Sequence, residues 1–154
     1  MPAALAPVIQ EDVTGCGIAS VATLAGVSYR EARAAASRLG IDVADPSLWS
    51  GTVRVRALMK HFRLRASRAE RPFRNWDGLP DLALLATKWH LERGVPFWHW
   101  CVFWRGPAGP VVLDPKRALR NNRRTDFGRI RPRWYIGVGR PSALRRVVQR
   151  PGHP

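Results

Sequence analysis

The stretch FWHWCVFW, residues 97–104, decides the fold of this chain. Aromatic residues dominate it, and aromatic side chains favour β-strands. Alternation along a strand sets His99 and Cys101 on one face and the tryptophans on the other. The turn residues at 106–109 and the apolar run PVVL at 110–113 predict that the chain returns as the second strand of a hairpin.

Helices are predicted on the N-terminal side of this hairpin. Residues 15–25 (GCGIASVATLA) are small and apolar, with the spacing of a buried helix face. Ser28 and Glu31 form a capping box that begins a second helix, and Gly40 ends it. Thr52 is a candidate cap for a third helix.

The remaining apolar segments belong to the sheet or are ambiguous. Residues 134–138 predict a strand, whereas residues 82–89 fit either a strand or a helix. Because helices come first and antiparallel strands follow, the sequence predicts an α+β fold. We expect one domain over residues 1–139 and a basic, disordered tail over residues 140–154.

The charge of the chain is unusual for a globular protein. There are 26 Lys+Arg against 11 Asp+Glu, a formal net charge of +15. Residues 116–154 hold twelve of the basic residues and a single acid, Asp126. Such a region attracts acidic proteins or nucleic acid. A solvated basic face with a disordered tail explains the same composition.

The sequence also limits the compartment. Two cysteines are too few for a disulfide framework. No apolar run approaches the roughly 20 residues of a membrane span. We therefore expect a cytoplasmic protein with reduced thiols and no membrane span.

Cys16 is the candidate nucleophile, because it begins a helix between two glycines. The positive end of a helix and its free N–H groups stabilise a thiolate. Gly15 and Gly17 leave room for a substrate carbonyl and are assigned to substrate binding. Gln10, six residues upstream, can donate a hydrogen bond to an oxyanion. The alternative is that Cys16 is a buried structural cysteine.

His99 is the candidate base, preferred over His90 because it lies among apolar neighbours in the aromatic strand. Asp114 follows the next strand, so pairing of the two strands brings it to the same end of the hairpin as His99. A carboxylate there orients the imidazole. A hydrogen-bonded core histidine and an Asx turn are the alternatives. The tryptophans form the core or one wall of a cleft, and Trp100 is assigned to substrate binding.

Four motifs in order then carry a family resemblance. They are Gln10-Glu11-Asp12, Thr14-Gly15-Cys16-Gly17, His99-Trp100-Cys101-Val102 and Asp114-Pro115. Together they resemble the papain-like cysteine peptidases, most closely the bacterial branch that removes double-glycine leader peptides. The resemblance covers about residues 8–115.

This resemblance implies a papain-like fold, in which the helix bearing the nucleophile packs on a C-terminal antiparallel sheet. It also implies a thiolate–imidazolium pair, a glutamine oxyanion donor and a thioester intermediate. Leader peptidases are usually fused to an export transporter. This chain has neither a membrane span nor a nucleotide-binding domain, so it resembles that branch as a stand-alone domain.

We therefore expect a cysteine peptidase that cleaves a peptide or protein substrate with a Cys-His-Asp triad. Glutamine deamidation or acyl transfer by the same triad stays open, as does a non-enzymatic basic binding module of the same fold. Cys16, Cys101, His99 and Asp114 also carry ligand types that suit zinc. Their spacing is not a zinc pattern, so no metal and no cofactor are expected.

Overall fold

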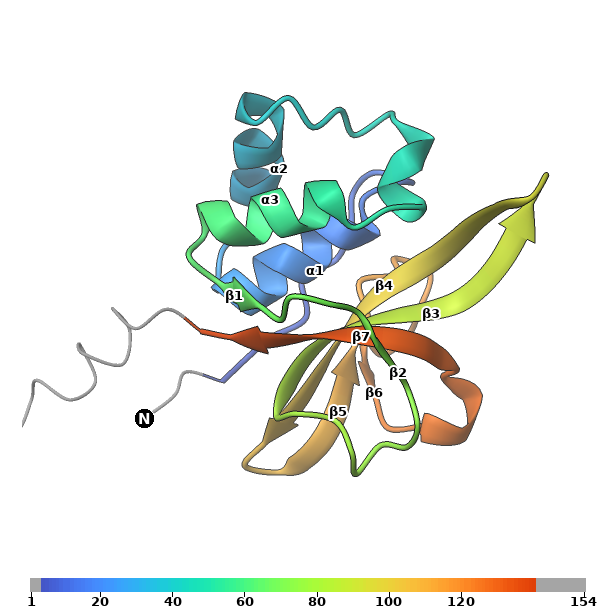
Figure 1. The fold of residues 1–154 in the computed structure, drawn as a ribbon. Coiled ribbons are helices and arrows are strands. Elements are labelled where there is room, and N and C mark those ends of the chain that lie inside the picture. The colour runs from blue at the N-terminus through green and yellow to red at the C-terminus, as the bar shows by residue number, and fades with distance from the viewer. Residues whose placement is uncertain (1–3, 141–154) are drawn as a thin grey trace, which may run out of the picture.

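The computed structural model describes residues 4–140. Three helices lie together on one side of a twisted sheet (Figure 1). The elements in chain order are α1 Cys16–Ala25, α2 Tyr29–Arg38, the 3-10 turn η1 Pro46–Trp49, α3 Val53–His61, β1 Arg65–Ala66, β2 Arg71–Pro72, β3 Leu82–Glu92, β4 Val95–Gly106, β5 Gly109–Leu113, β6 Arg123–Arg124, the 3-10 turn η2 Phe127–Arg129 and β7 Pro132–Gly139.

The sheet is antiparallel at every pairing between the described strands. Its strand order is β1-β7-β3-β4-β5-β6, and β2 pairs with β7 outside this path. The long central strands β3 and β4 pair from Leu82↔Trp104 to Glu92↔Val95. The predicted α+β class is confirmed. The more specific papain-like fold stays a prediction.

Alternation along the central strands separates two apolar cores. Leu84, Trp100 and Val102 face the helices and pack with residues of α1, α2 and α3. Leu85 and Phe103 face the other way, into a smaller cluster under the loops that follow β2 and β6. The sheet is therefore buried on both faces, which explains why residues 82–89 show no clear period in the sequence.

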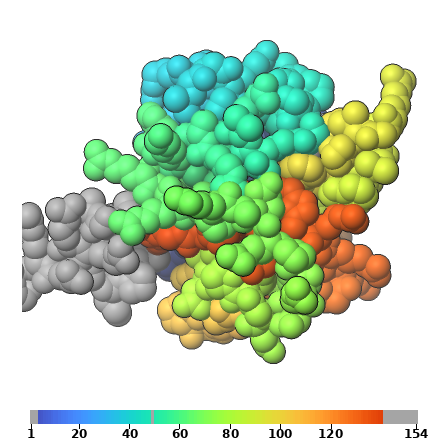
Figure 2. Space-filling model, in the orientation of Figure 1, coloured from blue at the N-terminus to red at the C-terminus, as the bar shows by residue number. Residues whose placement is uncertain are grey.

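Strand β4 is longer than the predicted residues 97–104. It forms a second hairpin with β3, a segment that the sequence left open between strand and helix, and the tip of this hairpin projects beyond the body of the molecule (Figures 1 and 2). Its register shifts between Thr87 and His90, where two residues of β3 oppose one of β4. Lys88 lies in this bulge with a φ of 53°. Bulges of this kind bend a strand and increase its twist. The bend occurs beside His99, which pairs with Thr87.

The helices begin and end close to their predicted limits. The Ser28 hydroxyl accepts a hydrogen bond from the Glu31 N–H, as the capping box requires. Thr52 occupies the cap position of α3, but its side chain makes no capping hydrogen bond. The short elements η1, β2, β6 and η2 have no counterpart in the prediction.

Neither cysteine forms a disulfide. None of the helices in residues 4–140 has the length and apolarity needed to cross a membrane. Residues 141–154 of the predicted tail lie outside the described residues.

Candidate active site

His99 and Asp114 meet where the pairing of β4 and β5 ends. The last paired residues are Val102 and Leu113, so Asp114 follows directly and reaches back along β4. The distance from His99 Nε2 to Asp114 Oδ1 is 2.8 Å. The predicted approach of these two residues at one end of the hairpin therefore occurs.

Asp114 is fully buried and is bound by three donors. Oδ1 accepts from His99 and from the Lys116 N–H at 3.0 Å, and Oδ2 accepts from Arg124 at 3.0 Å. Arg124 also forms a two-bonded pair with Asp126. Burial alone raises the pKa of Asp114, but the hydrogen bond and charge of His99, together with Lys116 and Arg124, lower it below its usual range. Asp114 is therefore ionised at neutral pH.

The pKa of His99 is shifted in the opposite direction, upwards. Its side chain is 16% exposed. Burial lowers its pKa, whereas the hydrogen bond to Asp114 and interactions with the Cys101 and Cys16 thiols raise it. The carboxylate prevails, so the pKa of His99 lies well above its ordinary value. Since Nε2 is bound to Asp114, Nδ1 is the nitrogen left to exchange a proton with a thiol.

Cys16 is the first residue of α1, with Gly15 as the N-cap. No side chain caps this helix, and its first turn contains no acidic residue. The N–H groups of a first helical turn have no partner within the helix. They are able to donate to a thiolate or an oxyanion, and that predicted role stays a prediction. The Cys16 residue is only 1% exposed.

The turn that leads into α1 is fixed by α2. The Asp12 carboxylate accepts from the Tyr29 hydroxyl at 2.5 Å and from Arg33 at 2.9 Å. The Asp12 carbonyl accepts from the Gly15 N–H at 3.0 Å. A Cβ on Gly15 would collide with the Tyr29 hydroxyl. Packing against Tyr29 therefore explains why residue 15 is a glycine. Its predicted role in substrate binding stays a prediction.

Gln10 lies beside the site, because its N–H donates to the Pro115 carbonyl at 3.0 Å. Its side-chain amide donates to the carbonyls of Asp12 and Val13, at 3.0 and 3.1 Å. Both amide hydrogens therefore hold the turn before Cys16, while Oε1 is buried without a partner. A donation to an oxyanion requires this amide to leave one turn carbonyl, so the oxyanion role of Gln10 stays a prediction.

Trp100 lies against α1, the helix that begins at Cys16. It is fully buried and packs edge-on against Trp98 and Trp134. A Cβ on Gly17 would lie 3.1 Å from its ring, so Gly17 allows α1 to approach β4 closely. This position fits the core interpretation of the tryptophans. Contact of Trp100 or Gly17 with a substrate stays a prediction.

Cys101 is a second thiol in the site, and the triad assignment did not include it. It is fully buried, with its sulfur 3.8 Å from the Thr87 hydroxyl. Ligand atoms of Cys101, His99 and Asp114 lie within 4.8 Å of one another. The alternation in residues 97–104 placed Cys101 on the face of His99, and that was the signal for it. The Arg124 contact had no comparable signal, since it depends on how the loop after Asp114 folds.

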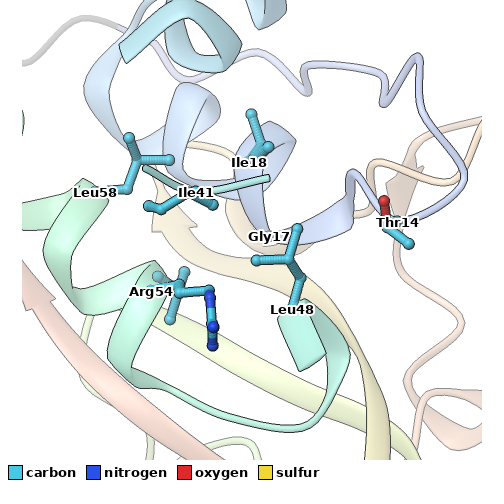
Figure 3. Close-up of a pocket in the computed structure, with 8 residues that line it drawn as sticks. Thr14, Gly17, Ile18, Ile41, Leu48, Arg54 and Leu58 are labelled. Atoms are coloured by element: carbon cyan, nitrogen blue, oxygen red, sulfur yellow. The ribbon is translucent and has the colours of Figure 1, made fainter. Parts of the chain in front are cut away.

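A small hollow lies next to the first turn of α1 (Figure 3). Ile18 and Leu58 contribute to an apolar lining, and Thr14, Gly17 and Arg54 complete the side near Cys16. Its volume is about 20 Å³, which is room for about one water molecule.

Known proteins add no assignment to this geometry. No family model and no curated protein matches the chain. The papain-like resemblance therefore rests on the motifs and their arrangement alone.

Several arginines of the basic C-terminal region form contacts within the fold. Arg123 donates to the Leu5 carbonyl at 2.7 Å, and Arg124 holds Asp114. Arg133 stacks on the Trp89 ring at 3.8 Å from its centre. These contacts give three arginines a role within the fold. An anionic partner for the rest stays a prediction.

Proposed function

We propose that this protein is a papain-like cysteine hydrolase that cleaves a peptide bond, with Cys16 as nucleophile, His99 as base and Asp114 as the residue that orients the base. One observation carries the proposal. The His99 ring is bound through Nε2 to a buried, ionised carboxylate, and the Cys16 thiol at the start of α1 is one of the groups that raise the pKa of this ring. This is the arrangement of a nucleophile, a base and an orienting group.

In this mechanism Asp114 keeps Nε2 protonated, so Nδ1 accepts the proton of the Cys16 thiol. The thiolate attacks the substrate carbonyl, and the free N–H groups at the start of α1 stabilise the resulting oxyanion. His99 gives its proton to the leaving amine, and a thioester remains on Cys16. Water, deprotonated by His99, then releases the acid and restores the thiol.

The burial of Cys16 limits the substrates that reach it. Because Cys16 is only 1% exposed, a peptide with small side chains at the scissile bond reaches it more readily than a peptide with bulky ones. Small residues before the cut, as in the double-glycine leaders of the branch that the motifs resemble, suit this access.

The limited access to Cys16 also favours a second candidate function, deamidation or acyl transfer at a glutamine side chain. The side-chain amide of glutamine is thin and reaches a buried thiol at the end of three single bonds. The triad then releases ammonia, or transfers the acyl group to an amine in place of water. Incubation with a peptide library separates the two functions, since peptidase activity yields fragments whereas deamidation only shifts the mass of an intact peptide.

The chemistry is tested first by alkylation of Cys16 with iodoacetamide over a pH series. A thiolate held by an imidazolium reacts well below the thiol's usual pKa of about 8.5. We expect His99→Ala to remove this low-pH reactivity and Cys16→Ala to remove the labelled site, located by mass spectrometry. His90→Ala is the matched control, because His90 is exposed and pairs with Glu92.

The proposal fails if Cys16 reacts no faster than a free thiol and the His99 variant behaves like the wild type. Cys101 serves as an internal reference in the same digest, since it is fully buried and its pKa is raised by burial.

A further inference from the structure

A groove lies between β2, the loop that follows β2, and β7. Two hollows of about 210 and 490 Å³ share Arg71, Gly78 and Tyr135 in their linings, so they form one groove. None of the residues assigned to hydrolysis lines either hollow. The proposed hydrolysis therefore gives this groove no role.

The loop that forms one wall of the groove is anchored to the body of the molecule. The Trp76 ring packs against three phenylalanine rings, with 4.8 to 5.9 Å between ring centres. Arg105 donates to the carbonyls of Trp76 and Leu79, at 3.2 and 3.1 Å. The groove is therefore formed in advance, and a ligand does not have to order this loop when it binds.

The chain beside the groove is dense in arginine. Residues 63–74 contain a single acid, Glu70, whose carboxylate is bound by Arg56 at 2.6 Å. Their arginines are Arg63, Arg65, Arg68, Arg71 and Arg74. Arg71 and Arg74 line the groove, and both are exposed and belong to no ion pair between residues that the structure describes. The segment lies on the face of the molecule seen in Figure 2.

These side chains suit an anionic ligand. A guanidinium offers two parallel donors, which match two oxygens of a phosphate or a carboxylate. Asn75 also lines the groove, and its Oδ1 accepts from the Gly78 N–H at 2.7 Å, so its NH₂ group is directed to donate elsewhere. Asp77, the next acid along the chain, is not part of the lining. The net charge of +15 attracts a polyanion over a longer range.

The edge of the sheet favours a nucleic acid over an acidic peptide. Among the described strands, β1 and β2 pair only with β7, so their outer side is an edge. Extended peptides bind such an edge by adding a strand through main-chain hydrogen bonds. The Phe73 N–H points inward to the Arg133 carbonyl at 3.0 Å. The outward position next to it is therefore Pro72, which has no N–H, and an edge proline opposes the addition of a strand.

The lining also favours a single strand over a duplex. Pro80 and Tyr135 provide apolar surface in the larger hollow, beside Arg71. The bases of a single strand are free to stack on such side chains while arginines bind the phosphates, whereas a duplex keeps its bases paired. We propose that this groove binds a single-stranded nucleic acid, with Arg71 and Arg74 on its phosphates and a base on Tyr135. The binding does not rest on the proposed function.

Fluorescence anisotropy tests the groove with a labelled oligothymidylate of about ten nucleotides, titrated with the full chain over a series of salt concentrations. We expect Arg71→Gln and Arg74→Gln each to weaken binding about tenfold, as for the loss of a charge-assisted hydrogen bond. Each should also reduce the slope of log K against log salt by about 0.7, the value for one phosphate of a single strand.

Arg30→Gln is the matched control, because it removes the same charge from an exposed position on α2. It should leave the affinity and the slope close to those of the wild type. Circular dichroism checks that each variant is folded. The proposal is overturned if the oligothymidylate does not bind at low salt, or if neither groove variant binds more weakly than Arg30→Gln.

Three further probes of equal charge test which ligand the groove takes. An abasic strand should bind more weakly than oligothymidylate, since it has phosphates but no base to stack. A hairpin duplex and an oligoglutamate should also bind more weakly. Equal or tighter binding of the abasic strand or the duplex would overturn the assignment to a single strand, and equal or tighter binding of oligoglutamate would identify an acidic peptide as the ligand instead.

Discussion

Asp114 is the residue on which the electrostatics of the site depend. It faces two cationic side chains, His99 and Arg124, and takes a third hydrogen bond from the Lys116 N–H. Arg124 divides its donors between Asp114, which is buried, and Asp126, which is partly exposed. Both carboxylates bind the Arg124 guanidinium, one buried and the other exposed. Mutating each in turn therefore compares a buried with an exposed ion pair.

We predict that Asp114→Ala lowers the free energy of unfolding by about 3–5 kcal/mol, because it leaves the buried His99 without its carboxylate and takes one of two carboxylates from Arg124. Asp126→Ala should cost only about 0–1 kcal/mol, as for an exposed ion pair. Urea unfolding of the two variants measures both values. Equal losses would show that burial of Asp114 does not set the strength of this cluster.

At the scale of the element, the two predicted helix caps have different outcomes. Ser28 accepts the Glu31 N–H at 3.1 Å at the start of α2. Thr52 holds the same position on α3 without a capping hydrogen bond. Sequence alone treats them alike, since both are short hydroxyl residues before a helix.

We predict that Ser28→Ala lowers the free energy of unfolding by about 1 kcal/mol. Thr52→Ala should have an effect near zero, because it removes no hydrogen bond from the helix start. Chemical denaturation followed by circular dichroism measures both variants. A loss for Thr52→Ala as large as that for Ser28→Ala would contradict the assigned difference.

The longer helices and strands were largely predictable, because their sequences show hydrophobic periodicity or a helix-capping residue. The segment at 82–89 resisted prediction, since a strand buried on both faces loses its alternation. The two-residue strands β2 and β6 are too short to show any period. The bulge at Lys88 depends on a non-glycine residue with positive φ, which the sequence does not mark.

At the scale of the whole molecule, the site assembles from distant parts of the chain. The meeting of His99 with Asp114 was predictable, because the pairing of adjacent strands fixes which residues lie at one end of a hairpin. The Arg124 contact was not, since residues 114–122 form a loop before β6 whose path follows from Asn122 binding the carbonyls of Asp114 and Lys116. Loop contacts of this kind follow no period.

The opposite pKa shifts give the molecule a defined pH dependence. The pKa of Asp114 is lowered on folding, so its contribution to stability is present above its unfolded value of about 4 and is lost as the pH falls through its folded pKa. The pKa of His99 is raised on folding. Its contribution is full below about pH 6.5 and declines as the pH rises towards its folded pKa.

We therefore predict that the pair stabilises the fold most between about pH 4 and 6.5. Asp114→Asn should flatten the acid limb, so that its unfolding free energy approaches that of the wild type as the pH drops. Urea midpoints across a pH series provide the measurement. An acid limb as steep in Asp114→Asn as in the wild type would assign the acid sensitivity to other carboxyl groups.

The hydrogen bond from the Gln10 N–H to the Pro115 carbonyl joins the segment before the nucleophile to the segment after the orienting acid. During synthesis Cys16 leaves the ribosome long before His99 and Asp114 exist. In the proposed mechanism its thiol has ordinary reactivity until the central hairpin has formed and the two segments have joined. In that mechanism a chain that is cut short or fails to complete its sheet carries a thiol of ordinary reactivity and does not hydrolyse peptides.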